Sequence, residues 1–223
     1  MPNLTAKWRH PVSGLTHFFA AVAALGGWAA LLVIGGFAPA GRAAALSVYG
    51  LSLVLMFGAS AAYHLAKPGP KGLTVLRKLD HSAIFLLIAG SYTPICALRL
   101  EGFWRVGMPA VIWSLALIGI GVKIFVVEAP RRLTAGVYVV MGWLSVFAVR
   151  PLMTALPTGA LIWLAAGGLI YTLGAVIYIL KKPDFVPGVF GFHEVWHIFV
   201  ILAAVAHFIA IAAYIAPTPA AGL

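Results

Sequence analysis

Three histidines near the end of the chain have a spacing that suits metal binding. His193 and His197 lie four residues apart in the stretch Phe192–Phe208, and His207 follows ten residues later. On a helix, residues four apart share one face and are separated by one turn. An apolar helix has no structural need for several imidazoles, so we expect His193 and His197 to bind one metal ion. Further ligands must then come from other parts of the chain.

The composition indicates that the elements positioning these residues are membrane helices. The chain of 223 residues is 63% hydrophobic and 9% charged, and its mean hydropathy is +1.04, whereas about a quarter of the residues of soluble domains are charged. The formal charge of +10 would suggest a nucleic-acid partner in a soluble protein. In a membrane protein it mainly encodes topology, so we expect no nucleic-acid partner. The single cysteine, Cys96, excludes an internal disulfide.

Seven apolar runs predict an all-α fold, a polytopic seven-transmembrane helix bundle. They lie at about 15–37, 43–65, 81–98, 106–127, 133–156, 159–180 and 193–216. Each run has roughly 18 to 24 residues, which is enough to cross a bilayer as a helix. The breaks between the runs are short and rich in Pro, Gly and charged residues. We therefore expect residues 1–223 to form a single seven-transmembrane domain.

The distribution of positive charge predicts the orientation of this bundle. Seven spans place the termini on opposite sides, and one side then carries only Arg42, Arg99, Arg105 and Arg150. The other 11 of the 15 Lys and Arg residues lie on the side that holds the N-terminus. Because Lys and Arg concentrate on the cytoplasmic side, the N-terminus is predicted to be cytoplasmic and the C-terminus to lie outside.

Under this topology, polar residues from three spans reach the same depth. The second run ends at His64, the third begins beside Asp80, and the last begins at His193, all at the cytoplasmic side. A carboxylate near the membrane boundary is costly unless it is paired, which favours a functional role for Asp80.

This convergence predicts a zinc site. Histidine is the commonest zinc ligand in proteins, and a catalytic zinc usually has three protein ligands and a position left for water. We expect His64, His193 and His197 to bind Zn²⁺, Asp80 to position or deprotonate the water, and Ser60, one turn before His64, to donate a supporting hydrogen bond.

A short motif offers an alternative. The segment His193-Glu194-Val-Trp-His197 spells H-E-x-x-H, in which the glutamate is the general base of a metalloprotease. The positive N-terminal end of a helix also favours a glutamate. We prefer the second interpretation, in which Glu194 stabilises the start of its helix.

The remaining histidines are expected to have other roles. We interpret His17 and His207 as hydrogen-bonded packing residues or interfacial groups, and His10 as a solvated residue next to the membrane. His207 lies about 15 Å along the helix from His197, too far to share the metal. His81 either faces a neighbouring helix or supports the site from behind.

These residues resemble the hemolysin III family, bacterial relatives of the progestin and adipoQ receptor family that includes the adiponectin receptors. Ser60-Ala-Ala-Tyr-His64 resembles its S-x-x-x-H motif, the segment from Asp80 to Pro94 resembles its D-H-x-x-I…A-G-x-Y-T-P motif, and the segment from His193 to His207 resembles its H-x-x-x-H-x9-H ending. The resemblance implies seven helices, a cytoplasmic N-terminus, and a zinc bound by His64, His193 and His197.

The resemblance also implies two kinds of function. The first is a zinc-dependent, ceramidase-like hydrolase of the bacterial inner membrane that cleaves a lipid amide entering from the bilayer. The second is a non-enzymatic hemolysin-type pore, or a sensor of membrane state, in which the zinc is structural. A structural zinc usually has a closed shell of four ligands, whereas a catalytic zinc keeps one position open.

Overall fold

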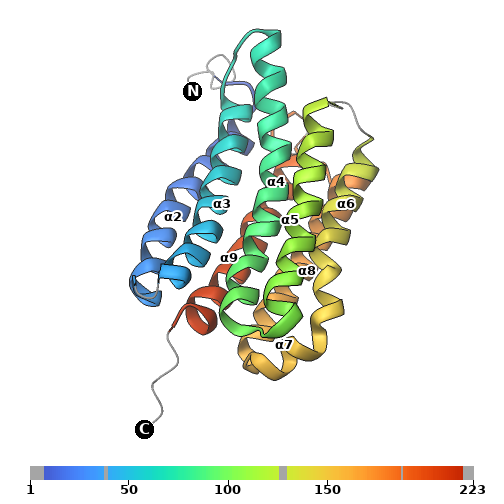
Figure 1. Cartoon of the computed structure of the whole chain (residues 1–223). Coiled ribbons are helices and arrows are strands. Elements are labelled where there is room, and N and C mark those ends of the chain that lie inside the picture. The colour runs from blue at the N-terminus through green and yellow to red at the C-terminus, as the bar shows by residue number, and fades with distance from the viewer. Residues whose placement is uncertain (1–7, 38–39, 126–129, 187, 218–223) are drawn as a thin grey trace.

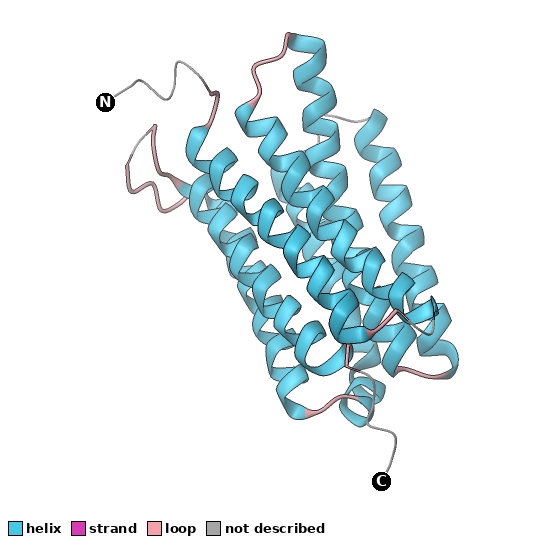
Figure 2. Cartoon of the chain, turned by 90° about the vertical axis from the view of Figure 1, so that its left-hand side faces the viewer, coloured by secondary structure: helices cyan, strands magenta, loops and turns pink. Residues whose placement is uncertain are grey.

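The described residues of the computed structural model, 8–37, 40–125, 130–186 and 188–217, form helices joined by short loops. Within these described residues, seven helices are long and apolar enough to cross a membrane. They are α2 (Pro11–Gly35), α3 (Ala40–Leu65), α4 (Pro70–Arg99), α5 (Gly102–Phe125), a fifth span made of α6 (Arg131–Trp143), η1 (Leu144–Ala148) and α7 (Val149–Ala155), then α8 (Thr158–Leu180), and a last span made of α9 (Phe192–Ala210) and η2 (Ile211–Ile215). The prediction of an all-α, seven-helix membrane bundle is confirmed (Figure 2).

Local sequence explains where several helices begin and end. Pro11 and Pro70 stand at the starts of α2 and α4, where the missing N–H of proline costs nothing and its fixed φ suits a helix. Gly36, with φ of 72°, follows α2, and Lys181, with φ of 57°, follows α8 in the left-handed conformation common at helix ends. α4 begins well before the apolar run does, because a helix can continue into water once its first turn is formed.

The fifth span is interrupted where a tyrosine side chain enters its hydrogen-bond ladder. The Tyr92 hydroxyl of α4 accepts a hydrogen bond from the Ser145 N–H at 2.9 Å and donates to the Gly142 carbonyl at 2.7 Å. A side chain that bonds to backbone groups in this way displaces the regular helical bonds. The helix changes to a 3-10 turn, η1, at this point.

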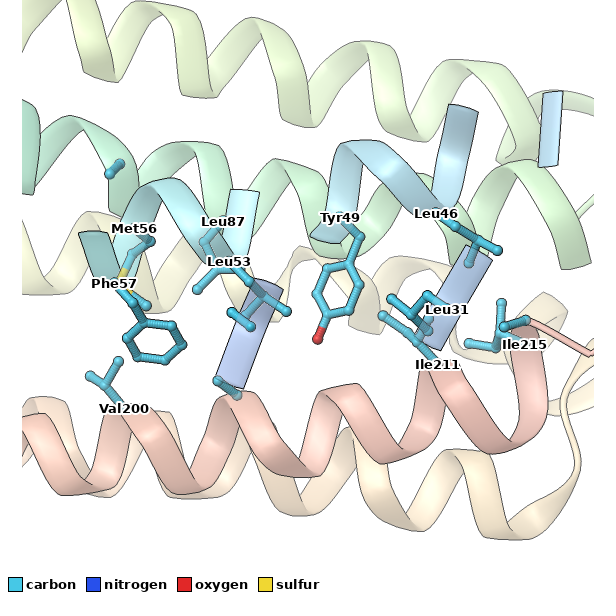
Figure 3. Packing of buried hydrophobic residues seen from close by; sticks show 14 of the residues in the cluster. Leu31, Leu46, Tyr49, Leu53, Met56, Phe57, Leu87, Val200, Ile211 and Ile215 are labelled. Carbon is cyan, nitrogen blue, oxygen red and sulfur yellow. The ribbon is translucent and has the colours of Figure 1, made fainter. Parts of the chain in front are cut away.

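The helices run side by side, and the described ends of the chain lie at opposite ends of the bundle (Figure 1). One apolar core joins α2, α3, α4, α8 and α9, and Figure 3 shows its side chains between α3 and α9. A second core joins α4 and α5 to the fifth span. α8 and α9 approach closely at Gly174, where a Cβ would press against Phe199 and Trp196. This packing fixes the start of α9, which carries His193 and His197.

Candidate metal centre

The predicted histidine ligands come together at the end of the bundle near the N-terminus. His64 lies in the last turn of α3, and His193 and His197 lie in the first two turns of α9. The Nε2 atom of His193 lies 3.4 Å from that of His64 and 3.2 Å from that of His197. His64 and His197 are buried and His193 is partly buried. The three side chains could therefore hold one metal ion between them.

The nitrogen spacing fits a small tetrahedral cation. With metal–nitrogen bonds of about 2.05 Å, two ligands of a tetrahedral zinc lie about 3.3 Å apart. Neutral imidazoles have one acceptor nitrogen each, and three Nε2 atoms that face one another cannot all be paired as donor and acceptor. A cation at their common focus would satisfy all of them.

The orientation of His64 is fixed by the segment that precedes α2. The His10 N–H donates to the His64 carbonyl at 2.9 Å, and the Arg9 guanidinium donates to the Tyr63 carbonyl at 2.5 Å. These donors satisfy carbonyls at the end of α3 that have no partner within the helix. The pKa of His10, which lies outside the spans, is lowered by desolvation against the bundle and then by the charge of Arg9. His10 is exposed, as predicted, and its backbone N–H has the further role of holding the end of α3.

The start of α9 is fixed by Glu194, the glutamate of the H-E-x-x-H segment. One oxygen of its carboxylate accepts the Gly191 N–H at 3.0 Å, and the other accepts the Ser13 hydroxyl at 2.7 Å. Glu194 thus caps α9 and connects it to α2. It is not among the described residues that line the cavity beside the histidines. This geometry favours the helix-stabilising interpretation over that of a protease base.

Asp80 and Ser60 line the same cavity as His193 and His197. The Ser60 side chain, one turn before His64, is hydrogen-bonded to the Asp80 carboxylate and so joins α3 to α4. His81 also lines the cavity. Its carbonyl accepts a hydrogen bond from Tyr138 at 2.9 Å.

His17 of α2 is in direct contact with a predicted ligand. Its ring centroid lies 3.9 Å from that of His197, and its edge meets the ring of Phe57 at 5.1 Å. The side chain is 3% exposed, and neither ring nitrogen has a hydrogen-bond partner among the described residues. His17 also lines the cavity. His17 therefore packs in the interior as expected, but it packs against the candidate site and lacks the expected hydrogen bond among the described residues.

A cavity of about 520 Å³ extends from the histidines along the bundle. It passes between the fifth span and α8 and α9, and reaches Leu100 and Ile211 near the opposite end. Its walls are largely apolar, and polar side chains lie both at the histidine end and further along the cavity. Such a cavity can hold a long apolar chain whose polar end lies at the metal centre.

Comparison with known proteins agrees with the motifs and the fold. The family model described as haemolysin-III related matches residues 6–208. The chain belongs to this family. It is 37% identical over 173 residues to the hemolysin-3 homolog of Bacillus subtilis, which covers 78% of each chain, and 37% identical over 174 residues to hemolysin-3 of Bacillus cereus, which covers 78% of this chain and 76% of the relative. It is also 30% identical over 178 residues to the adiponectin receptor protein of Drosophila melanogaster, covering 71% of this chain and 39% of the receptor.

In this haemolysin-III related protein, His17 lies closer to the histidine group than its sequence position had suggested. His17 lies six residues into α2, and His197 lies five residues into α9. Both helices start at the same end of the bundle, so the two histidines reach nearly the same depth. The depth comparison that grouped His64 with His193 would have placed His17 next to His197 as well.

Proposed function

We propose that this haemolysin-III related protein is a zinc-dependent membrane hydrolase that cleaves a lipid amide or ester. The observation that carries the proposal is the convergence of three Nε2 atoms, 3.2 and 3.4 Å apart, at one end of a long apolar cavity. We also propose that the chain is one seven-transmembrane domain of the bacterial inner membrane, with its N-terminus in the cytoplasm. The lipid would then come from the bilayer that surrounds the bundle.

The side chains around the histidines suit this reaction. A zinc ion held by His64, His193 and His197 would supply Lewis acidity that polarises the carbonyl and makes water nucleophilic at neutral pH. Asp80 accepts the proton of the attacking water and passes it to the leaving amine as the carbon–nitrogen bond breaks. Ser60 donates a hydrogen bond that holds the Asp80 carboxylate in place. The apolar cavity binds the acyl chain and orients its carbonyl toward the histidines.

The test separates proton transfer from metal binding. We expect Asp80→Asn to retain one metal ion per chain and to slow hydrolysis of fluorogenic lipid amides by roughly 10²- to 10⁴-fold, the usual contribution of a general base. Asp184→Asn, a change of an exposed aspartate outside the spans, is the matched control and should leave the rate unchanged. A normal rate in Asp80→Asn would remove Asp80 from the mechanism.

The printed names of the Bacillus relatives favour a second candidate, a hemolysin-type pore in which the metal is structural. This candidate predicts dye release from liposomes that does not depend on Asp80. Dye release together with no hydrolysis of lipid amides or esters by the zinc-loaded protein would select the pore.

A further inference from the structure

A second polar group lines the cavity far from the histidine ligands. It consists of Tyr49 on α3, Tyr171 on α8 and His207 on α9, and the proposed mechanism uses none of them. Tyr49 and Tyr171 belong to the same apolar core. The rings of Tyr171 and His207 meet edge to face, with centroids 5.6 Å apart. Three helices thus bring hydrogen-bonding side chains to the wall of the cavity, which Ser91 and Thr172 also line.

Within this group, the Tyr49 hydroxyl is the fully buried polar atom that lacks a hydrogen-bond partner among the described residues. The Tyr49 side chain is 1% exposed. Figure 3 shows the phenol pointing from α3 toward α9. A buried hydroxyl without a partner is costly, and most such groups in proteins are paired. A packing role alone would be served equally well by phenylalanine.

His207 offers a complementary acceptor. Its Nε2 lies 3.2 Å from the Leu164 carbonyl. A carbonyl only accepts hydrogen bonds, so Nε2 carries the proton and Nδ1 is the acceptor of the neutral ring. A Cβ at Gly167 of α8 would collide with this ring, so the glycine makes room for the imidazole. Together, Tyr49 and His207 provide one donor and one acceptor, the pair that a hydroxyl group can use.

The distance from the metal centre defines where that hydroxyl would be. His207 lies ten residues beyond His197 on α9, which is about 15 Å along the helix. With carbon–carbon bonds of about 1.5 Å, an extended chain advances about 1.3 Å per carbon, so this distance corresponds to about 12 carbons.

We propose that Tyr49, Tyr171 and His207 form a subsite for a hydroxyl group carried near the middle of a lipid acyl chain. The position of the hydroxylated carbon rests on the proposed function, because the proposed function places the carbonyl of the lipid at His193 and His197. The preferred substrates are then amides of mid-chain hydroxylated fatty acids.

The experiment compares acyl chains that differ only in the hydroxyl. An octadecanoyl amide is compared with the same amide hydroxylated at about carbon 12 and at carbon 2. We expect the wild-type protein to hydrolyse the mid-chain hydroxylated amide with a kcat/KM about tenfold higher than that of the plain chain, the effect of one or two good hydrogen bonds. The chain hydroxylated at carbon 2 should gain nothing from the subsite.

The Tyr49→Phe variant isolates the hydroxyl of the subsite. It should lose the tenfold preference, whereas Tyr214→Phe, a change outside the cavity-lining residues, should keep it. Equal rates for the plain and mid-chain hydroxylated amides in the wild-type protein would overturn the proposal and leave water as the partner of Tyr49. That comparison needs no variant, so it decides the question even if Tyr49→Phe fails to fold.

A binding measurement separates this proposal from the proposed function. The corresponding free fatty acids are titrated into wild-type protein and Tyr49→Phe in detergent, with the thermal unfolding midpoint as readout. If no amide or ester is hydrolysed but the mid-chain hydroxy acid still stabilises the wild-type protein more than the plain acid does, the hydrolase proposal fails and the subsite stands. If the protein hydrolyses the amides without preferring the hydroxylated chain, the hydrolase proposal stands and the subsite proposal fails.

Discussion

The two ends of the last span bind their polar partners in opposite ways. At the start of α9, the Nε2 atoms of His64, His193 and His197 point at one another. At the far end, guanidinium donors meet carbonyl acceptors: Arg42 donates to the Ala216 carbonyl at 2.9 Å, and Arg99 donates to the Tyr214 carbonyl at 2.7 Å. Arg99 also donates to the carbonyls of Ile215 and Pro217.

This difference separates a structural site from a binding site. At the arginine end the protein supplies both the donor and the acceptor of each of these hydrogen bonds, which satisfy free carbonyls of a helix terminus. At the histidine end the same kind of atom converges from two helices, and the three nitrogens could hold a metal ion between them. Side-chain atoms of the same kind that face one another without complementary partners therefore indicate a binding site for a ligand.

The largest effect is expected from removing one converging nitrogen. His197→Ala should reduce the metal content from one ion per chain to nearly none and abolish hydrolysis, because two imidazoles no longer enclose a tetrahedral site. His207→Ala, a change of the same residue type on the same helix, should retain the metal. Metal analysis of both purified variants checks this. A His197→Ala protein that keeps its metal would show that the three histidines are not the ligands.

The convergence of His64, His193 and His197 could be predicted from sequence because membrane topology limits depth. The Lys and Arg asymmetry placed His64 and His193 at the same end, and each then had to point inward to avoid lipid. The long α4 was not predicted, since an apolar run marks only the part of a helix within the bilayer. The 3-10 turn in the fifth span depends on Tyr92, whose partner Ser145 is 53 residues away in the chain. The unpaired hydroxyl of Tyr49 also depends on neighbours that only the fold reveals.

The arginine end should respond in stability and not in metal binding. Arg99→Ala removes a charged donor from three carbonyls at the end of η2, and we expect a loss of about 3 kcal/mol in the free energy of unfolding. Arg105→Ala, a change of an exposed arginine on α5 at the same end of the bundle, should change stability by less than about 0.5 kcal/mol. Denaturation in mixed micelles measures both. A loss of bound metal in Arg99→Ala would contradict the division between the two ends.

A smaller effect is expected at His17, which packs against the ring of His197. His17→Ala leaves a gap against the ring of His197, and we expect metal affinity to fall about tenfold, as is common when residues behind a ligand are removed. His17→Phe keeps a ring in the same place and should restore most of the affinity. Metal competition with a fluorescent chelator measures both variants. If phenylalanine restores nothing, the ring nitrogens of His17 act directly and His17 belongs to the binding group.

The smallest effect is expected at Glu194. It lies between His193 and His197 in the sequence, but its carboxylate accepts hydrogen bonds from Ser13 and Gly191. Ser13→Ala removes one of its hydrogen bonds and should lower the free energy of unfolding by about 1 kcal/mol. Glu194→Gln keeps an acceptor for the Gly191 N–H and should retain both the metal and the rate of hydrolysis, because the carboxylate faces the helix end and α2. The protease alternative predicts instead that Glu194→Gln retains the metal and loses hydrolysis, as Asp80→Asn should. Rates and metal contents of these two variants, measured side by side, decide which carboxylate accepts the proton.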